Sequence, residues 1–310
     1  MEQQDILSMT LPELQAAVQE LGEPKFRAKQ IFNWLHQKRV TDFSEMTTLS
    51  LPFRERLASD FCINRLKIAK RLASSVDDTV KYLYELPDGN YVETVCMQYH
   101  HGTSLCISTQ VGCRMGCRFC ASAIAGFVRN LTPAEMLLQI YETERAQNCK
   151  ISSLVLMGIG EPLDNFDNVL RFLQLLSDPN GYGMSLRHVT VSTCGVVPKI
   201  LELAEQRLGL TLSVSLHCPN DAGRSAIMPI NRSYPIDVLL DACQTYFEKT
   251  GRRVTFEYAV MDQVNSAEQD AAALAERLKG LHVHVNLIPI NPVKERNFHT
   301  LKKTVLQFQK

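Results

Sequence analysis

The chain has 310 residues, of which 45% are hydrophobic and 21% are charged, and its 33 basic residues balance its 33 acidic ones. This length suits about two domains, and the composition is that of an ordinary soluble globular protein without low-complexity tracts. The zero net charge excludes an overall basic footprint for nucleic acid, so any RNA contact must use local patches such as 64–71 and 251–253.

The sequence contains neither a candidate membrane span nor a signal peptide. No stretch is long and apolar enough to cross a bilayer, and the N-terminus MEQQDILSMT has no basic flank of the kind that signal peptides carry. We therefore expect a cytoplasmic protein with no membrane partner. Ten cysteines in that reducing compartment argue against a disulfide framework, so some are expected to be ligands, reactive groups or core residues.

The first 62 residues favour a helical accessory domain. The segment 10–21 begins with the helix-capping residue Thr10 and continues with leucines and alanines spaced for one helix face. Apolar residues recur at helical spacing in 25–38, and 51–61 reads as a third helix.

From residue 63 to 102 the period changes to that of strands. Apolar and polar residues alternate over 79–99 on both sides of the turn sequence PDGN at 87–90. This pattern predicts a β-hairpin that links the helical domain to the rest of the chain.

From residue 103 to 295, six short β-rich runs alternate with five helical stretches. Such alternation implies parallel strands joined by right-handed crossovers. We therefore expect an α/β fold with a partial (β/α)6 barrel, in which functional groups collect at the carboxyl ends of the strands. Residues 296–310 are expected to begin a C-terminal segment. The expected strands lie at 104–109, 153–158, 187–192, 211–216, 253–260 and 282–290.

Three cysteines directly follow the first expected barrel strand, in GCRMGCRFCAS: Cys113, Cys117 and Cys120. A structural zinc site needs four ligands, and no second CxxC pair is present. A [4Fe–4S] cluster is normally held by four thiolates, so three would leave one iron open for a substrate or cofactor. The alternative is that the three cysteines are ordinary loop or core residues and bind no metal. Their glycine and arginine neighbours make a place in the core less favourable.

Polar groups follow four more of the expected strands. Glycines in MGIGEP allow close approach of backbone to a ligand, and Glu161 in the same segment can pair with an ammonium group. Each group alone could be ordinary loop chemistry, but together they face the cysteine loop. The other strand-end candidates are Ser192, Ser215, His217 and Asn291.

Taken together, these motifs resemble those of the RlmN/Cfr family of radical S-adenosylmethionine (SAM) methyltransferases, which methylate an adenosine of 23S ribosomal RNA. The resemblance covers nearly the whole chain, and the RlmN branch looks closer than the Cfr branch. It rests on KFRAKQIFNWLHQK, TSLCISTQVGCRMGCRFCAS, GFVRNLTPAEMLLQI, MGIGEPLDN, VTVSTCGVVPKI, SVSLHCPND, IMPINRSYPI and NLIPINP.

The resemblance implies a role for each matching residue. The three loop cysteines would ligate a [4Fe–4S] cluster, Glu93 would accept a proton, and Cys106 would resolve the reaction by forming a disulfide with a methyl-carrying cysteine. The SAM site would be lined by Gly160, Glu161, Ser192, Ser215, Leu216, His217 and Asn291.

The resemblance also implies substrates and partners. The expected reaction is methylation of C2 of an adenosine in 23S rRNA, with transfer RNA as a second substrate, by a monomeric enzyme. A flavodoxin or ferredoxin would supply electrons. Methylation at C8, as in the Cfr branch, is the alternative regiochemistry.

One departure from the family pattern leaves further alternatives open. In the family, the methyl-carrying cysteine lies in a tail beyond the sixth strand, and no residue here matches it; the last cysteine is Cys243. We therefore expect either a truncated chain or a paralogue that binds RNA without catalysis. A radical SAM enzyme that acts on another substrate, without a carrier thiol, is the third reading.

Overall fold

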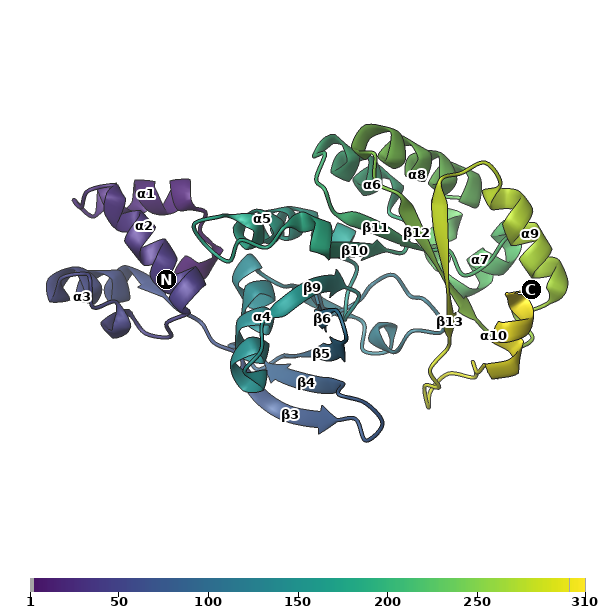
Figure 1. Ribbon diagram of the computed structural model, residues 1–310, viewed down its shortest axis with the longest axis horizontal. Helices are drawn as coiled ribbons and strands as arrows, with labels where there is room; N and C mark the ends of the chain where they lie inside the picture. The colour runs from purple at the N-terminus through teal and green to yellow at the C-terminus, as the bar shows by residue number, and fades with distance from the viewer. Residues whose placement is uncertain (1–2, 301, 310) are drawn as a thin grey trace. The chain divides into compact units, whose positions relative to one another are not determined.

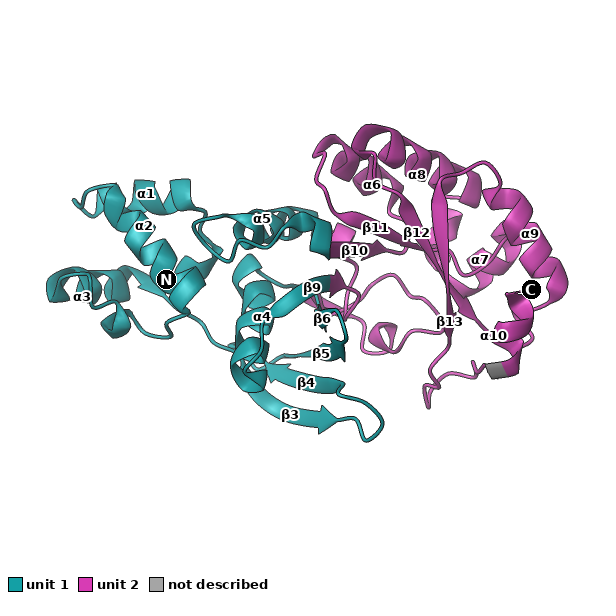
Figure 2. Cartoon of the chain, viewed as in Figure 1, with its two compact units in different colours: residues 1–109, 130–154, 165–188 teal, residues 110–129, 155–164, 189–310 magenta. Residues whose placement is uncertain are grey.

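The computed structural model describes residues 3–300 and 302–309 (Figure 1). The chain forms two compact units whose segments alternate along the sequence (Figure 2). Unit 1 contains residues 1–109, 130–154 and 165–188, and unit 2 contains 110–129, 155–164 and 189–310.

The helices expected near the N-terminus are all present in unit 1. Thr10 is the N-cap residue of the first of them, and the Glu13 carboxylate accepts the Thr10 backbone N–H at 2.8 Å. A π-helical turn, Trp34–Lys38, prolongs the second helix. The three helices are α1 (Leu11–Glu20), α2 (Phe26–Asn33) and α3 (Leu51–Asp60).

Unit 1 also holds an antiparallel sheet in the strand order β3, β4, β5, β6. The predicted hairpin is confirmed as β4 and β5. It belongs to a larger sheet, because part of the basic run 64–71 forms an additional strand whose residues are all exposed. The four strands are β3 (Lys67–Ala73), β4 (Val80–Glu85), β5 (Tyr91–Tyr99) and β6 (Gly102–Cys106).

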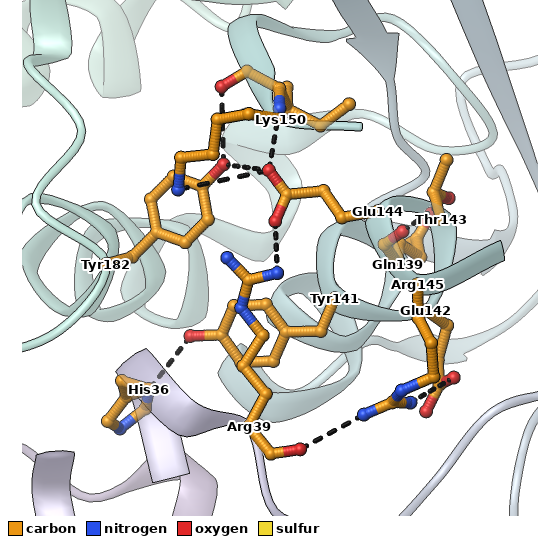
Figure 3. Close-up of polar contacts among 11 residues, drawn as sticks. His36, Arg39, Gln139, Tyr141, Glu142, Thr143, Glu144, Arg145, Lys150 and Tyr182 are labelled. Atoms are coloured by element: carbon orange, nitrogen blue, oxygen red, sulfur yellow. Dashed lines mark hydrogen bonds and ion pairs between the residues drawn. The ribbon is translucent and has the colours of Figure 1, made fainter. Parts of the chain in front are cut away.

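The helix α4 (Pro133–Gln147) carries a buried polar cluster, shown in Figure 3. The carboxylate of Glu144, only 3% exposed, forms an ion pair with Arg39, and its Oε1 accepts hydrogen bonds from the Tyr182 hydroxyl at 2.7 Å and the Ile151 N–H at 2.6 Å. Arg39 follows α2, so this one carboxylate joins the N-terminal helices to α4 (Figure 3). A buried charge needs such partners because it has lost its hydration.

Beside this cluster lies a fully buried imidazole. Nδ1 of His36 is 2.9 Å from the Tyr141 hydroxyl (Figure 3). The ring of His36 is also in a tilted contact with Phe32. Burial lowers the pKa of His36 to about 4, although the negative charge of Asp178 opposes this shift. His36 is therefore neutral in the folded protein at neutral pH.

Unit 2 contains four parallel strands, β10, β11, β12 and β13, with α6 packed against α8. These elements match the expected strand–helix alternation. The strands are β10 (Val189–Thr193), β11 (Thr211–Ser215), β12 (Val254–Val260) and β13 (Val283–Pro289), and the helices are α6 (Val197–Glu205), α7 (Asp221–Ile227), α8 (Ile236–Thr250), α9 (Glu268–Leu278) and α10 (Lys302–Phe308).

The remaining elements flank the expected barrel strands. The first two barrel strands are β6 and β9 (Ile151–Leu156), which are neighbours, and α5 (Phe166–Ser177) packs on α4. The sequence did not predict α7 or the short pair of β7 (Gln110–Gly112) and β8 (Phe127–Asn130). No helix in the described ranges is long and apolar enough to cross a membrane.

The buried neutral His36 predicts a specific pH dependence of stability. The unfolded chain binds a proton at this histidine below about pH 6.5, whereas the folded chain does so only near pH 4, so acid favours unfolding. Between these values the free energy of unfolding should fall by up to about 3 kcal/mol as the pH decreases. Chemical denaturation at several pH values measures this slope.

The matched variants are His36→Phe and His188→Phe, the latter at an exposed histidine of the same unit. The first should flatten the slope between pH 4 and 6.5, and the second should leave it unchanged. Equal slopes in all three proteins would contradict the buried, neutral assignment.

Candidate functional site

Unit 2 contains a pocket of about 430 Å³ at the carboxyl ends of its strands. This is the edge at which the barrel pattern predicts functional groups. Segments far apart in sequence meet there. Nearly all of the predicted metal and SAM residues line it: Cys113, Cys117, Cys120, Gly160, Glu161, Ser192, Ser215, His217 and Asn291.

The cysteine loop begins with a glycine that no other residue could replace without moving backbone. Gly112 has φ +72°, and a Cβ there would lie 1.8 Å from the carbonyl oxygen of Gly126. The next residue, Cys113, donates its backbone N–H to that same carbonyl at 2.9 Å. The loop is therefore closed at its base by β7 and β8, and the cysteines project from a fixed turn.

Side chains hold the loop against the segment that follows β9. Nε of Arg114 is 2.9 Å from Oδ2 of Asp164, and its guanidinium lies 3.8 Å from the centre of the Phe127 ring. The same carboxylate oxygen accepts a hydrogen bond from Gln110 at 2.8 Å. These contacts fix the position of the cysteine loop relative to residues 158–164.

Glu161 lies in that segment and is 3% exposed. Its Oε2 accepts the backbone N–H of Cys194 at 2.7 Å, and its Oε1 accepts that of Leu163 at 3.0 Å. Burial raises the pKa of Glu161, and these hydrogen bonds act in the opposite direction. The carboxylate is held rigidly at the pocket wall, where a cationic ligand group would stabilise its charge.

Gly160 brings the same segment into contact with β7. Its φ is +111°, and a Cβ there would lie 2.7 Å from Cβ of Gln110. The glycine thus serves a close approach of two backbones as well as lining the pocket.

His217 has a defined proton position. Its Nδ1 accepts the backbone N–H of Ala259 at 2.9 Å, so the neutral ring carries its proton on Nε2. Burial, with a smaller contribution from the positive charge of Arg224, lowers the pKa of His217 to about 3. The ring packs edge-on against Phe119 in the cysteine loop and offers the pocket a neutral hydrogen-bond donor.

Arg224, which the sequence interpretation did not single out, ties two strand ends together. It is completely buried, and its guanidinium donates to the carbonyl oxygens of Cys194 at 2.6 Å and of Ser215 at 3.0 Å. Further bonds reach the carbonyl of Leu216 at 3.1 Å and Oδ1 of Asn231 at 2.9 Å. Within the described chain it makes no ion pair with a carboxylate, so its charge is stabilised by carbonyl dipoles.

Two further residues differ from the sequence expectation. The side chain of Leu216 is fully buried and does not line the pocket. Glu257 lines the pocket although it was not predicted, and its carboxylate accepts hydrogen bonds from Ser213 at 2.7 Å and Asn286 at 2.8 Å. A charged residue within the apolar run of β12 was the sequence signal for Glu257.

Comparisons with known proteins agree with this geometry. The profile described as "Ribosomal RNA large subunit methyltransferase N-terminal domain" matches residues 4–63, and that described as "Radical SAM superfamily" matches 107–275. A curated protein of Lachnoclostridium phytofermentans, named "Probable dual-specificity RNA methyltransferase RlmN", is 52% identical over 95% of this chain and 83% of its own length. The chain belongs to the RlmN family of radical SAM methyltransferases.

Two further relatives cover the chain almost completely. A protein of Alkaliphilus oremlandii with the same curated name is 49% identical over 100% of this chain and 90% of its own length. The crystal structure of a radical SAM methyltransferase from Sphaerobacter thermophilus matches 99% of this chain and 91% of that one, with a TM-score of 0.94 and 39% identity. The expected radical SAM fold is therefore confirmed.

Membership of this family implies a [4Fe–4S] cluster and SAM, and the loop thiols suit the cluster. All three thiols line one pocket, yet no group of three His, Cys, Asp or Glu side chains among the described residues is placed to hold a single metal ion. Three thiols that line one pocket would supply ligands for such a cluster. Burial raises the pKa of Cys113, and that of Cys117 to about 12, so ligation must displace their protons.

The two predicted catalytic residues lie in unit 1, on neighbouring strands. Cys106 in β6 pairs with Val95 in β5, two residues from Glu93, so both side chains are on the same face of the antiparallel sheet. The Glu93 carboxylate is 2.6 Å from Nζ of Lys81. Leu105 and Ile107 are fully buried, which shows that the half-buried Cys106 is on the other face of its strand.

Replacement of Arg224 should destabilise the chain strongly. Arg224→Met would leave three buried carbonyls without their donor, at a cost of about 3 kcal/mol or more in the free energy of unfolding. Arg232→Met, at an exposed arginine of the same unit, should cost less than about 0.5 kcal/mol. Equilibrium urea denaturation compares them, and equal stabilities of the two variants would refute the role given to Arg224.

Proposed function

We propose that this chain transfers a methyl group from SAM to C2 of an adenosine in 23S rRNA, with transfer RNA as a second substrate. One observation carries the proposal: three thiols, a fixed buried carboxylate and several strand-end polar groups line a single pocket. The curated names of the relatives, dual-specificity RNA methyltransferases, support RNA as the substrate class.

The cysteine loop would hold the cluster. When bound, the [4Fe–4S] cluster and SAM supply one-electron chemistry that no protein side chain provides. Cys113, Cys117 and Cys120 would ligate three irons and leave a fourth open. The contacts of Arg114 with Asp164 and Phe127 would keep this loop in position.

The strand-end groups would bind and orient SAM. Glu161 would accept hydrogen bonds from its ammonium group, because its carboxylate is fixed at the pocket wall by two backbone N–H donors. His217 would donate from Nε2, and the hydroxyls of Ser192 and Ser215 and the amide of Asn291 would complete the polar lining.

Glu93 and Cys106 would act on the adenine. The carbon between the two ring nitrogens is electron-poor, so ordinary polar transfer from SAM to it is unfavourable. The carboxylate of Glu93 would take the proton that this carbon loses. Cys106 would then release the product by attacking the sulfur that carries the transferred carbon: an S–S bond would form as the S–C bond breaks, and the released carbon would take up a proton to become the methyl group. In the family that sulfur belongs to a C-terminal cysteine, a position that none of the ten cysteines of this sequence matches.

The reaction also needs partners. The target base must leave its stack, because neighbouring bases otherwise cover the ring carbon. A one-electron donor of the flavodoxin or ferredoxin type would reduce the cluster. We place the reaction in the cytoplasm, with the enzyme as a monomer.

Mass spectrometry of the product tests this function. The anaerobically reconstituted protein, a reductant, SAM with a labelled methyl group and an rRNA transcript should yield labelled 2-methyladenosine after nuclease digestion. Glu93→Gln should slow the reaction by about a hundredfold or more, because the proton acceptor is lost. Label at C8 would assign the Cfr-type reaction instead, and unlabelled RNA would contradict methyl transfer by this chain.

Cys106 has a matched control in the neighbouring strand. Cys106→Ala should abolish product release, whereas Cys96→Ala changes a cysteine on the opposite face of the same sheet, where it pairs with Leu105. Cys96→Ala should therefore retain methylation. Equal activities of the two variants would remove Cys106 from the mechanism.

A further inference from the structure

Unit 2 has a second pocket, of about 350 Å³, at the opposite edge of its strands. Thr211 begins β11, Thr255 is the second residue of β12, and His282 directly precedes β13. The pocket is therefore at the amino ends of the parallel strands, whereas the cysteine pocket is at their carboxyl ends. Its complete lining is Thr211, Gly251, Arg252, Arg253, Thr255 and His282.

The two arginines bring positive charge that the described part of the chain does not neutralise. Neither Arg252 nor Arg253 makes an ion pair with any described carboxylate, and no acidic residue lines the pocket. The Arg252 guanidinium donates to Oγ1 of Thr211 at 3.2 Å, and its Nε is buried without a hydrogen-bond partner in the described ranges. A buried donor without a partner is unfavourable, so an anion here would satisfy it.

Part of the pocket lining is held in position before any ligand binds, through Arg252 and His282. Helix α8 ends at Gly251, whose φ of +66° turns the chain sharply, and the next backbone N–H, of Arg252, bonds to Oγ1 of Thr250 at 3.1 Å. His282 stacks on Phe247 with ring centres 5.0 Å apart. Pre-ordered donors lose less conformational entropy on binding than mobile surface side chains do.

We propose that this pocket binds a phosphate group, and that the phosphate belongs to the backbone of the RNA substrate. Two guanidinium groups and two hydroxyls form a set rich in donors, which suits the several acceptor oxygens of a phosphate. The strands joining the two edges have five to seven residues, so the edges lie roughly 20 Å apart. The bound phosphate would thus be several nucleotides from the target base. The enzyme would contact a folded RNA both at this pocket and at the target base.

This inference rests on the proposed function, because it takes RNA as the substrate. The test measures binding of an rRNA fragment to the reconstituted full chain at several salt concentrations. Arg252→Gln/Arg253→Gln should weaken binding about tenfold and reduce the dependence of log Kd on log salt by about one or two. Methylation at saturating RNA should keep its wild-type rate, because this pocket and the cysteine pocket lie at opposite edges of the same strands.

Three further variants distinguish the loss of positive charge from the loss of folded protein. Arg253 is exposed, so Arg253→Gln alone should fold normally and give part of the loss, while Arg253→Lys keeps the charge and should bind within about threefold of the wild type. Arg232→Gln, at an exposed arginine outside the pocket, should bind as the wild type does. Wild-type affinity and salt dependence in the double variant would overturn the inference.

Inorganic phosphate distinguishes the possible sources of the ligand. It should bind the wild type weakly, compete with RNA, and lose binding in the double variant. Loss of phosphate binding with unchanged RNA affinity would overturn the assignment to RNA. If the wild type methylates RNA and the double substitution leaves RNA affinity unchanged, the phosphate site is refuted but the proposed function is not. If the wild type neither binds nor methylates RNA, both the phosphate site and the proposed function are refuted.

Discussion

The buried guanidinium of Arg224 is the constraint on which the candidate site depends. It donates hydrogen bonds to the carbonyl of Cys194, directly after β10, and to that of Ser215, the last residue of β11. The carboxylate of Glu161 accepts the N–H of the same Cys194. Arg224 of α7 and Glu161 thus fix the positions of three segments relative to one another: the ends of β10 and β11, and residues 158–164. The cysteine loop is secured to the same framework, because Arg118 donates its backbone N–H to Ile227 at 2.9 Å.

This arrangement places the positive charge of Arg224, which has no carboxylate partner among the described residues, near thiols that burial alone would keep protonated. The charge of Arg224 lowers the pKa of Cys117, although desolvation and the neighbouring thiols raise it by more. An apolar group in place of Arg224 would avoid the cost of burying a charge, but it could not satisfy the strand-end carbonyls or favour thiolate ligands. The contacts of Arg224 therefore serve both the stability of the fold and the chemistry of the site.

The sequence was sufficient to predict most of the architecture, because strand–helix alternation and strand-end placement depend on local patterns. Cys113, Glu161, Ser192 and His217 were found by that rule, and the structure brings them to one pocket. The sequence did not predict the role of Arg224, because that role depends on hydrogen bonds to carbonyls 9 and 30 residues away, and no local pattern indicates such contacts. The sequence also did not predict the pairing of β7 with β8, because strands of three and four residues are too short to show a periodic pattern.

The central claim is that the three loop thiols would hold a [4Fe–4S] cluster with one iron left open for SAM. Iron analysis and electron paramagnetic resonance of the reduced, anaerobically reconstituted chain test it directly. The account predicts about four irons per chain, a resonance that shifts when SAM is added, and loss of both in Cys117→Ala. A cluster whose spectrum is unchanged by saturating SAM, or iron that Cys117→Ala retains, would contradict it.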